Sequence, residues 1–185
     1  LPILKNVIIQ NKIHHAYLFT GMQGVGKTSM ARIFAKAVNC TNNQLGELCQ
    51  QCEICQQNQQ LFQDIIEIDA ASHNGVEEIR NLKANAIVKP AVARYKVYIV
   101  DEVHMLSKSA FNAFLKLLEE PPRHVIFILA TTEINKVPET ILSRCQVFYF
   151  QPITNHRLGT FLADVAKKEL LSFDFVAMEA IAKHT

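Results

Sequence analysis

The sequence predicts an α/β protein in which a parallel sheet lies between two layers of helices. Three observations support this prediction. Short apolar segments that fit buried strands alternate along the chain with amphipathic segments that fit helices, which is the order of βαβ units. A glycine-rich loop joins the first strand to the next helix. Polar residues directly follow three strands, and ligands of parallel sheets bind at these carboxyl ends.

Five segments have the length and the apolar character of buried strands. They are residues 16–21, 64–69, 96–103, 124–132 and 146–150. Most of them are uninterrupted apolar runs, which are typical of strands whose two faces are both covered. The sequence therefore predicts a sheet of five strands.

Helices are indicated where apolar residues recur at three- and four-residue spacing. These segments are residues 1–10, 28–39, 74–88 and 108–120, and the pattern is again helical from Thr154 to the end, with its clearest runs at 158–171 and 175–184. Pro90 follows the third and Pro121 the fourth, and proline cannot continue a helix. Residues 136–145 are expected to form a connector with a short helix.

The composition excludes several classes of protein. The 185 residues are nearly half hydrophobic and carry a net charge of only +2, so the chain is neither disordered nor strongly basic. No apolar run reaches the ~18 residues of a membrane span, and Lys5 and Lys12 interrupt the start of the chain, so no signal peptide is predicted. A cytoplasmic location is expected. The chain begins without Met and ends inside a helix-like pattern, which favours a fragment of a longer protein.

The segment GMQGVGKT, residues 21–28, matches the phosphate-binding P-loop motif between a strand and a helix. Its glycines allow backbone N–H groups to surround phosphate oxygens, and the helix directs its positive end toward them. Lys27 is expected to reach the terminal phosphates and Thr28 to bind Mg²⁺. The predicted nucleotide-binding residues are Gly21, Met22, Gln23, Gly24, Val25, Gly26, Lys27, Thr28 and Ser29. A glycine-rich turn that matches by chance is the alternative, which this strand–loop–helix context disfavours.

Polar residues after two later strands fit the chemistry of nucleotide hydrolysis. Asp101 would hold Mg²⁺ through water, and Glu102 would take a proton from an attacking water. Adjacent residues of a strand point to opposite faces, so these acids are expected to have different roles. Thr132 is favoured as the residue whose hydroxyl group would hydrogen-bond the γ-phosphate or the attacking water. The alternatives are that Asp101 and Glu102 are only solvated acids at a strand end, and that Thr132 only ends its strand in an ordinary turn.

Two further polar residues have both a functional and a structural interpretation. Arg144, before the last strand, could stabilise developing phosphoryl charge, although a surface arginine paired with an acid is the common case. His104 follows the two acids and is interpreted as a packed histidine at a strand end.

Four of the five cysteines lie within sixteen residues: Cys40, Cys49, Cys52 and Cys55. Four thiolates at this spacing suit a tetrahedral Zn²⁺ and leave no open position for catalysis. A disulfide is disfavoured in a cytosolic protein, and an iron–sulfur cluster is a minor alternative. The sequence therefore predicts a structural zinc module. Cys145 is expected to be a small buried hydrophobic residue.

These motifs together resemble the ATPase domain of the gamma/tau subunits of bacterial DNA polymerase III, in the AAA+ superfamily. The matching segments are HHAYLFTGMQGVGKTSMAR, the four-cysteine insertion, EIDAASHNGVEEIR, KVYIVDEVHMLSKSAFNAFLKLLEEPP, FILATTE and TILSRCQVF. They extend over nearly the whole chain. The P-loop alone is shared by many families, whereas the zinc insertion, DEVHML and SRC in one chain are far more specific.

The resemblance implies a five-stranded AAA+ core over residues 1–152, with the zinc module at 40–55, and the beginning of a helical lid over 153–185. It implies ATP, Mg²⁺ and Zn²⁺ as cofactors, and an ATPase within a DNA polymerase holoenzyme. The family's segment before Leu1, which helps to hold adenine, and the second sensor arginine after Thr185 are outside this chain.

The resemblance also implies a role for each candidate residue. Lys27 and Glu102 would be catalytic, Thr132 would be the first sensor, and Arg144 would complete the site of a neighbouring subunit. The implied partners are other clamp-loader subunits, further copies of the chain, the sliding clamp and primer–template DNA, with no membrane. A non-hydrolysing scaffold subunit and a branch-migration helicase are the alternatives. The intact P-loop disfavours the first, and the cysteine insertion and SRC disfavour the second.

Overall fold

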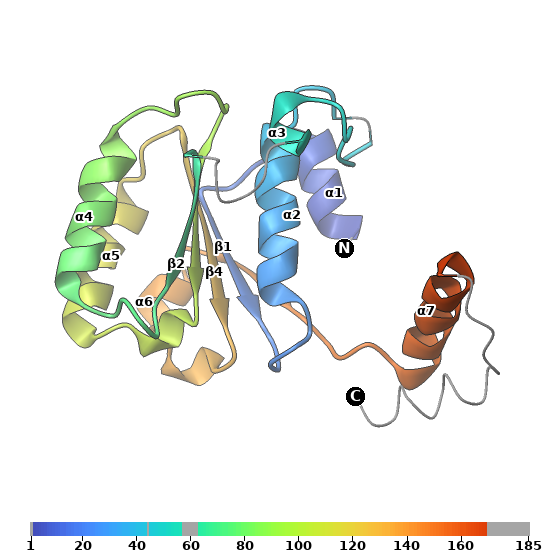
Figure 1. The fold of residues 1–185 in the computed structure, drawn as a ribbon. Helices are drawn as coiled ribbons and strands as arrows, with labels where there is room; N and C mark the ends of the chain where they lie inside the picture. Colours follow the sequence, from blue (N-terminus) through green and yellow to red (C-terminus); the bar gives the residue numbers. More distant parts are fainter. Residues whose placement is uncertain (1, 44, 57–62, 170–185) are drawn as a thin grey trace. The chain divides into compact units, whose positions relative to one another are not determined.

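Five parallel strands form one sheet in the order β2-β3-β4-β1-β5 in this computed structural model, which describes residues 2–43, 45–56 and 63–169 (Figure 1). The strands are β1 (Ala16–Thr20), β2 (Ile65–Asp69), β3 (Lys96–Asp101), β4 (Val125–Thr131) and β5 (Gln146–Tyr149). The predicted fold class, a parallel five-stranded sheet flanked by helices, is confirmed.

The strand order brings the polar strand ends together. β1 lies between β4 and β5, so the chain skips two strands on its way from β1 to β2. In the register of the sheet, Thr20 lies opposite Thr131, and Asp69 lies opposite Asp101. The carboxyl ends of β1, β3 and β4 therefore meet at one edge, where the order of strands reverses and ligands of such sheets bind.

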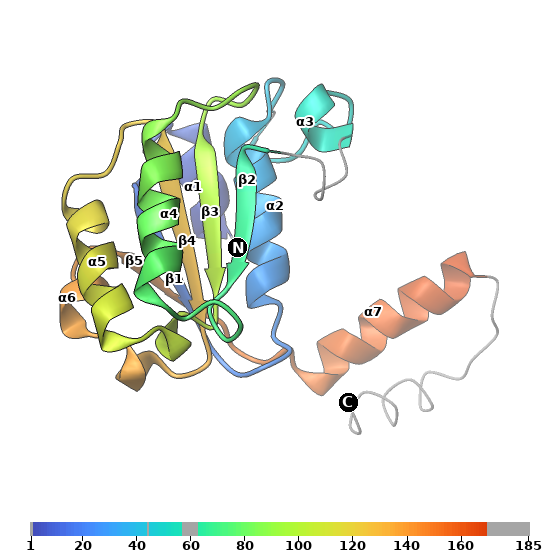
Figure 2. The same cartoon turned by 60° about the vertical axis from the view of Figure 1, so that its left-hand side comes forward.

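Helices cover both faces of the sheet (Figures 1 and 2). On one face lie α1 (Pro2–Ile9), α2 (Lys27–Asn39) and α3 (Glu53–Gln56), and on the other lie α4 (Val76–Ile87), α5 (Lys108–Glu119) and α6 (Glu139–Leu142). Short 3₁₀ turns, η2 (Val103–Met105) and η3 (Ile134–Lys136), follow β3 and β4.

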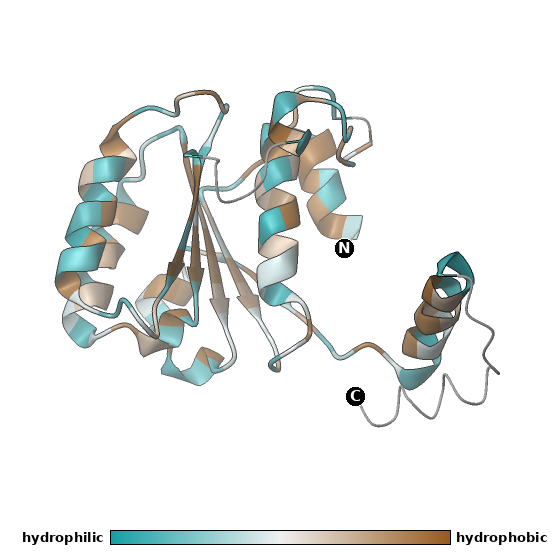
Figure 3. Cartoon of the chain, in the orientation of Figure 1, coloured by the Kyte–Doolittle hydropathy of each residue, from teal (hydrophilic) through white to brown (hydrophobic). Residues whose placement is uncertain are grey.

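The hydrophobic core has two layers because successive strand residues point to opposite faces. In β1, Tyr17 and Phe19 pack with α2, while Leu18 packs with the layer of α4 and α5. Every residue of β1 and β4 is buried, and Figure 3 shows the central strands as hydrophobic and the helices as mixed. Burying one such large apolar side chain contributes about 1.5–3 kcal/mol, so this double layer rigidly supports the strand ends.

Two polar contacts fix α2, the helix that follows the P-loop, against the sheet. Arg32 donates two hydrogen bonds, of 2.9 and 2.6 Å, to the carboxylate of Glu67 on β2. The buried side chain of Asn39 accepts a hydrogen bond from the backbone N–H of Tyr95 and donates to the carbonyl oxygens of Tyr95 and Ala35. The half-exposed ion pair adds at most about 1 kcal/mol, so the buried amide is the more important anchor.

The structure departs from the sequence-based prediction at two places, and one further prediction is not tested. The strand expected over 96–103 ends at Asp101, because Glu102 has a left-handed backbone (φ 47°, ψ 46°) from which η2 starts. The cysteine segment contains the four-residue helix α3, which is too short for periodicity to reveal. The helix predicted over 175–184 lies outside the described residues.

The chain divides into two compact units at Phe150–Gln151. The described part of the second unit contains α7 (Asn155–Lys168), which begins after Thr154 as the sequence pattern predicts. Among the described residues, no helix combines the length and the apolar character needed to cross a membrane.

Candidate nucleotide-binding and metal sites

The P-loop, residues 21–28, connects β1 to α2 with a backbone that glycine favours. Gly24 (φ 80°) and Gly26 (φ 89°) have left-handed conformations, and Gly26 is the N-cap of α2. Residues with a side chain rarely adopt these φ values. Both positions therefore need glycine to bring the loop around the first turn of the helix. The N–H groups of that turn have no partner within the helix, which makes this loop a ready anion site.

Lys27 folds back over the loop that precedes it. Its Nζ donates hydrogen bonds of 3.0 and 2.9 Å to the carbonyl oxygens of Gly21 and Met22, and only 6% of the residue is exposed. These two acceptors hold the ammonium group against the first residues of the P-loop. A phosphate oxygen bound there would find a positive charge already in position.

The two residues predicted to hold magnesium lie in direct contact. The hydroxyl of Thr28, in the first turn of α2, donates a 2.7 Å hydrogen bond to Oδ2 of Asp101 at the end of β3. Oδ1 of the same carboxylate accepts a hydrogen bond from the backbone N–H of Glu102. A hydroxyl oxygen beside a carboxylate is the donor set that Mg²⁺ prefers. These residues therefore fit a magnesium site.

Glu102 and Thr132 also meet, although each directly follows a different strand. Oε2 of Glu102 accepts hydrogen bonds from the hydroxyl group (3.1 Å) and the backbone N–H (3.3 Å) of Thr132. Glu102 follows the last residue of β3 and has a left-handed backbone, so strand alternation does not set the direction of its side chain. The candidate base and the candidate sensor thus form one unit beside the candidate magnesium ligands.

His104 and Thr131 belong to the same group, which the sequence interpretation did not anticipate for either residue. Nδ1 of His104 lies 3.0 Å from Oγ1 of Thr131 and 3.2 Å from Oε2 of Glu102. His104 is packed, as predicted, but its ring is also part of the polar cluster at the strand ends. Its position three residues after Asp101, the acid that ends β3, is the signal that could have indicated this.

Arg144 is separate from this cluster. It follows α6, and its guanidinium group donates a 2.7 Å hydrogen bond to Oε1 of Glu119 and another to the carbonyl oxygen of Thr140. The side chain is one-third exposed. The contact with Glu119 agrees with the structural interpretation, while the exposure leaves the guanidinium group accessible to a neighbouring chain.

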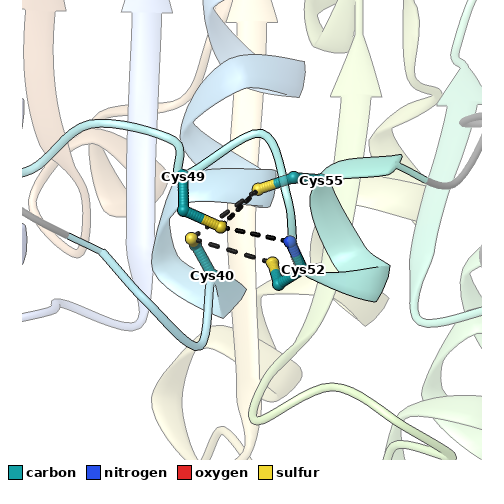
Figure 4. A group of neighbouring side chains, drawn as sticks. All are labelled: Cys40, Cys49, Cys52 and Cys55. Carbon is teal, nitrogen blue, oxygen red and sulfur yellow. Dashed lines mark hydrogen bonds between the residues drawn. The ribbon is translucent and has the colours of Figure 1, made fainter.

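The four predicted metal-binding cysteines converge between the end of α2 and α3 (Figure 4). The sulfur atoms of Cys49 and Cys55 are 3.8 Å apart, those of Cys52 and Cys40 are 3.9 Å apart, and those of Cys55 and Cys40 are 3.6 Å apart. Four sulfurs placed about 2.3 Å from a central Zn²⁺ in a tetrahedron lie about 3.8 Å from one another. The cluster therefore has the dimensions of a four-cysteine zinc site.

The geometry also bears on the alternatives for the cysteines. All five are free thiols, and the distances in the cluster are far longer than the ~2.05 Å of a disulfide bond. An iron–sulfur cluster contains several atoms, so its ligand sulfurs would have to lie farther apart than ligands of one ion. The backbone N–H of Cys52 donates to Sγ of Cys49, which would stabilise thiolate charge at the metal. Burial raises the pKa of Cys145 to about 12, as expected for an inert packed thiol.

We expect about one Zn²⁺ per chain in protein purified without chelator. Replacing any one of Cys40, Cys49, Cys52 or Cys55 by serine should lower the melting temperature by about 5 °C or more, because metal binding and local folding are coupled. Nucleotide affinity should persist, since the P-loop lies at one end of α2 and Cys40 caps the other, about 20 Å away. Elemental analysis and thermal melting measure both effects. Cys145→Ser is the control that should keep its zinc, and wild-type protein without zinc would contradict the assignment.

Two cavities of similar size lie away from the P-loop. One, of about 590 Å³, is bounded by β2 and α4, and the other, of about 600 Å³, is bounded by η3, α6 and Tyr149. Neither is lined by a residue of the P-loop. The assignment of the nucleotide site therefore rests on backbone geometry and on the converging polar groups.

Comparison with protein families gives a match over residues 1–154 to the family described as DNA polymerase III, delta subunit. The chain is 51% identical over 180 residues to the tau subunit of DNA polymerase III from Bacillus subtilis. The matched region covers 97% of this chain and 32% of that subunit. It is 49% identical over 184 residues to the tau/gamma subunit from Haemophilus influenzae, with coverage of 99% and 27%. The chain thus spans about a third or less of these relatives.

Comparison with solved structures shows the fold. A DNA polymerase III gamma subunit-related protein from Thermotoga maritima has a TM-score of 0.66 and 22% identity, over 97% of this chain and 57% of that one. The RuvB Holliday junction branch migration motor of the same organism has a TM-score of 0.68 and 19% identity, over 97% and 52%. The resemblance to gamma/tau subunits seen in the motifs is confirmed by the sequence relatives. The family match includes most of the residues of this chain, so the chain belongs to the DNA polymerase III, delta subunit family.

Proposed function

We propose that this chain is the ATP-binding and ATP-hydrolysing part of a bacterial DNA polymerase III clamp loader, which loads the sliding clamp onto primed DNA. The observation that supports this most strongly is the P-loop beside two strand-end acids, with Thr28 bonded to Asp101 at 2.7 Å. The relatives named tau and tau/gamma support the replicative context. Four free thiols close enough to share one ion fit the reducing cytoplasm, which we include in the proposal.

ATP binding would use the P-loop and its helix. Backbone N–H groups of residues 21–28 would surround the β- and γ-phosphates, and the ammonium group of Lys27 would move from the carbonyl oxygens of the loop to phosphate oxygens. Thr28 and Asp101 would hold Mg²⁺, Thr28 directly and Asp101 through water. When bound there, the ion would supply positive charge that offsets the negative charge of the phosphate groups.

Hydrolysis would use Glu102 as the base and Thr132 as its partner. A water oxygen attacks the γ-phosphorus while Glu102 takes a proton from that water. The bond from the γ-phosphorus to the β–γ bridging oxygen breaks, and ADP and inorganic phosphate leave. Thr132 would detect a bound γ-phosphate. Its hydroxyl group would exchange the hydrogen bond to Glu102 for one to the phosphate.

Arg144 would act on the site of a neighbouring copy. Its guanidinium group is bonded to Glu119 and lies outside the cluster around Glu102, so within one chain it has no described contact with the phosphate-binding loop. An assembly of several copies would bring such an exposed arginine to the next P-loop. There it would stabilise the charge that develops on the transferred phosphoryl group.

A basic groove supports primed DNA as a partner. Arg80 and Lys83 of α4 and Lys116 of α5 line a hollow of about 430 Å³ between these helices. All three side chains are exposed, although Arg80 is paired with Glu77. Cations along a groove suit contacts with phosphate groups of a nucleic-acid backbone, which position a duplex without reading its sequence.

The two alternatives have weaker support. A scaffold subunit that does not hydrolyse ATP would not need the contacts from Thr28 to Asp101 and from Thr132 to Glu102. A branch-migration motor shares the fold at 19% identity, whereas the relatives named as DNA polymerase III subunits reach 51%. The proposal therefore favours the clamp loader.

The decisive experiment measures ATP hydrolysis by the full-length protein in its assembled complex. We expect the rate to rise when the sliding clamp and primed DNA are added together, because loading couples both to hydrolysis. The clamp or DNA alone should stimulate less. A rate that responds to branched DNA without the clamp would favour the branch-migration alternative, and no hydrolysis under any condition would favour the scaffold.

A further inference from the structure

His104 lies between two carboxylates at the carboxyl ends of β3 and β4. Its side chain is only 6% exposed, and both ring nitrogens have polar neighbours. Nδ1 is 3.2 Å from Oε2 of Glu102 and 3.0 Å from Oγ1 of Thr131, while Nε2 is 3.4 Å from Oε1 of Glu133. With these contacts the buried imidazole does more than fill space in the core, because each contact restricts the orientation of the ring.

The neighbours of Nδ1 favour one tautomer of His104. Nδ1 shares a 3.0 Å hydrogen bond with the Thr131 hydroxyl and lies 3.2 Å from the Glu102 carboxylate. An ionised carboxylate only accepts, so a proton on Nδ1 makes both contacts attractive. Oγ1 of Thr131 also accepts the backbone N–H of Glu133 at 3.0 Å. This second bond fixes the hydroxyl oxygen, and the hydroxyl oxygen in turn fixes the plane of the ring.

We propose that His104 is a positioning residue for Glu102, an inference that rests on the proposed ATPase function. The contacts from Thr132 and His104 all end on Oε2 of Glu102. They come from two elements, the end of β4 and η2, so together they fix the direction of the carboxylate. Oε1 is then the oxygen that receives the proton of the attacking water.

The backbone explains why Glu102 needs this support. It lies just after β3 in a left-handed conformation, its side chain is 30% exposed, and it has several rotatable bonds. A flexible base spends much of its time outside hydrogen-bonding distance of the water. When Thr132 turns toward phosphate during the reaction, His104 remains the partner that keeps Glu102 in place, so its effect is on the rate of the chemical step.

Two substitutions separate this role from packing. Asparagine can place an amide N–H near the position of Nδ1, and glutamine can place one near the position of Nε2. In the full-length assembled complex with clamp and primed DNA, His104→Gln should lower kcat about 10- to 100-fold, because small misplacements of a catalytic group cost this much. ATP affinity, measured by titration, should stay within about threefold of wild type. His104→Asn should lose no more than about threefold in kcat.

A second route does not alter the histidine. Thr131→Val removes the hydroxyl group that orients the ring but keeps the shape of the buried side chain, and it should lower kcat about 3- to 10-fold with unchanged ATP affinity. His124→Gln is the matched control, since Nε2 of His124 bonds to the carbonyl oxygen of Ala86, away from the cluster. Its kcat should equal that of wild type.

The outcomes distinguish this inference from the proposed function. Equal kcat values for His104→Asn and His104→Gln, or losses in ATP affinity that parallel the losses in kcat, would overturn the positioning role. So would Thr131→Val with wild-type kcat. If the wild-type complex does not hydrolyse ATP at all, the proposed function itself fails. Hydrolysis that needs Lys27 but is indifferent to His104 removes only this inference.

Discussion

Lys27→Ala is expected to abolish ATP binding or hydrolysis while leaving the fold intact. The ammonium group of Lys27 is held over the loop by the carbonyl oxygens of Gly21 and Met22, where phosphate oxygens would replace them. A charge-assisted hydrogen bond is worth about 1.5–3 kcal/mol, so affinity should fall at least about 10- to 100-fold. Hydrolysis should fall further, because Lys27 also stabilises charge in the transition state. Nucleotide titration and steady-state ATPase assays measure the two effects.

The fold of Lys27→Ala should persist, because the lysine faces the loop and not the hydrophobic core. Circular dichroism and thermal melting check this. Lys12→Ala, at an exposed lysine before β1, is the matched control and should change neither affinity nor rate. Unchanged ATP affinity together with unchanged hydrolysis in Lys27→Ala would refute the nucleotide site.

The parts of the site that could be predicted from sequence are those encoded locally. The P-loop follows from the spacing of Gly21, Gly26 and Lys27 between a strand and a helix. The meeting of Thr28 with Asp101 follows from one rule, that parallel strands end at the same edge of a sheet. The cysteine spacing was likewise enough to predict a cluster with the dimensions of a zinc site.

The rest depends on contacts between segments that are distant in sequence. The position of His104 required the end of β4, 27 residues later, where Thr131 orients the ring. The left-handed backbone of Glu102 ended β3 two residues before the apolar pattern did, because Val103 is buried from a 3₁₀ turn and not from a strand. The acid that pairs with Arg144 is 25 residues away on α5, and no sequence pattern selects Glu119 among the exposed acids.

Arg144→Ala should reduce ATP hydrolysis on the order of 10³-fold in the assembled complex while leaving ATP affinity close to wild type. An arginine that stabilises phosphoryl charge contributes to the transition state more than to binding of ATP. The contact with Glu119 supplies a control. If Arg144 had only a structural role, its effect on activity would come from that ion pair. Glu119→Gln breaks the pair and keeps the arginine, so it should retain most of the activity.

Mixing two inactive variants tests whether Arg144 acts on a neighbouring site. A Lys27→Ala chain keeps its arginine but has no working P-loop, and an Arg144→Ala chain keeps a working P-loop but offers no arginine. Each alone should be nearly inactive. In verified mixed assemblies, the clamp- and DNA-stimulated ATPase should partly recover, because the arginine of one chain can serve the P-loop of the other. Recovery is impossible if Arg144 acts only within its own chain, since no chain in the mixture then has both groups. Mixed assemblies that stay inactive would therefore assign Arg144 to its own chain or to the ion pair with Glu119.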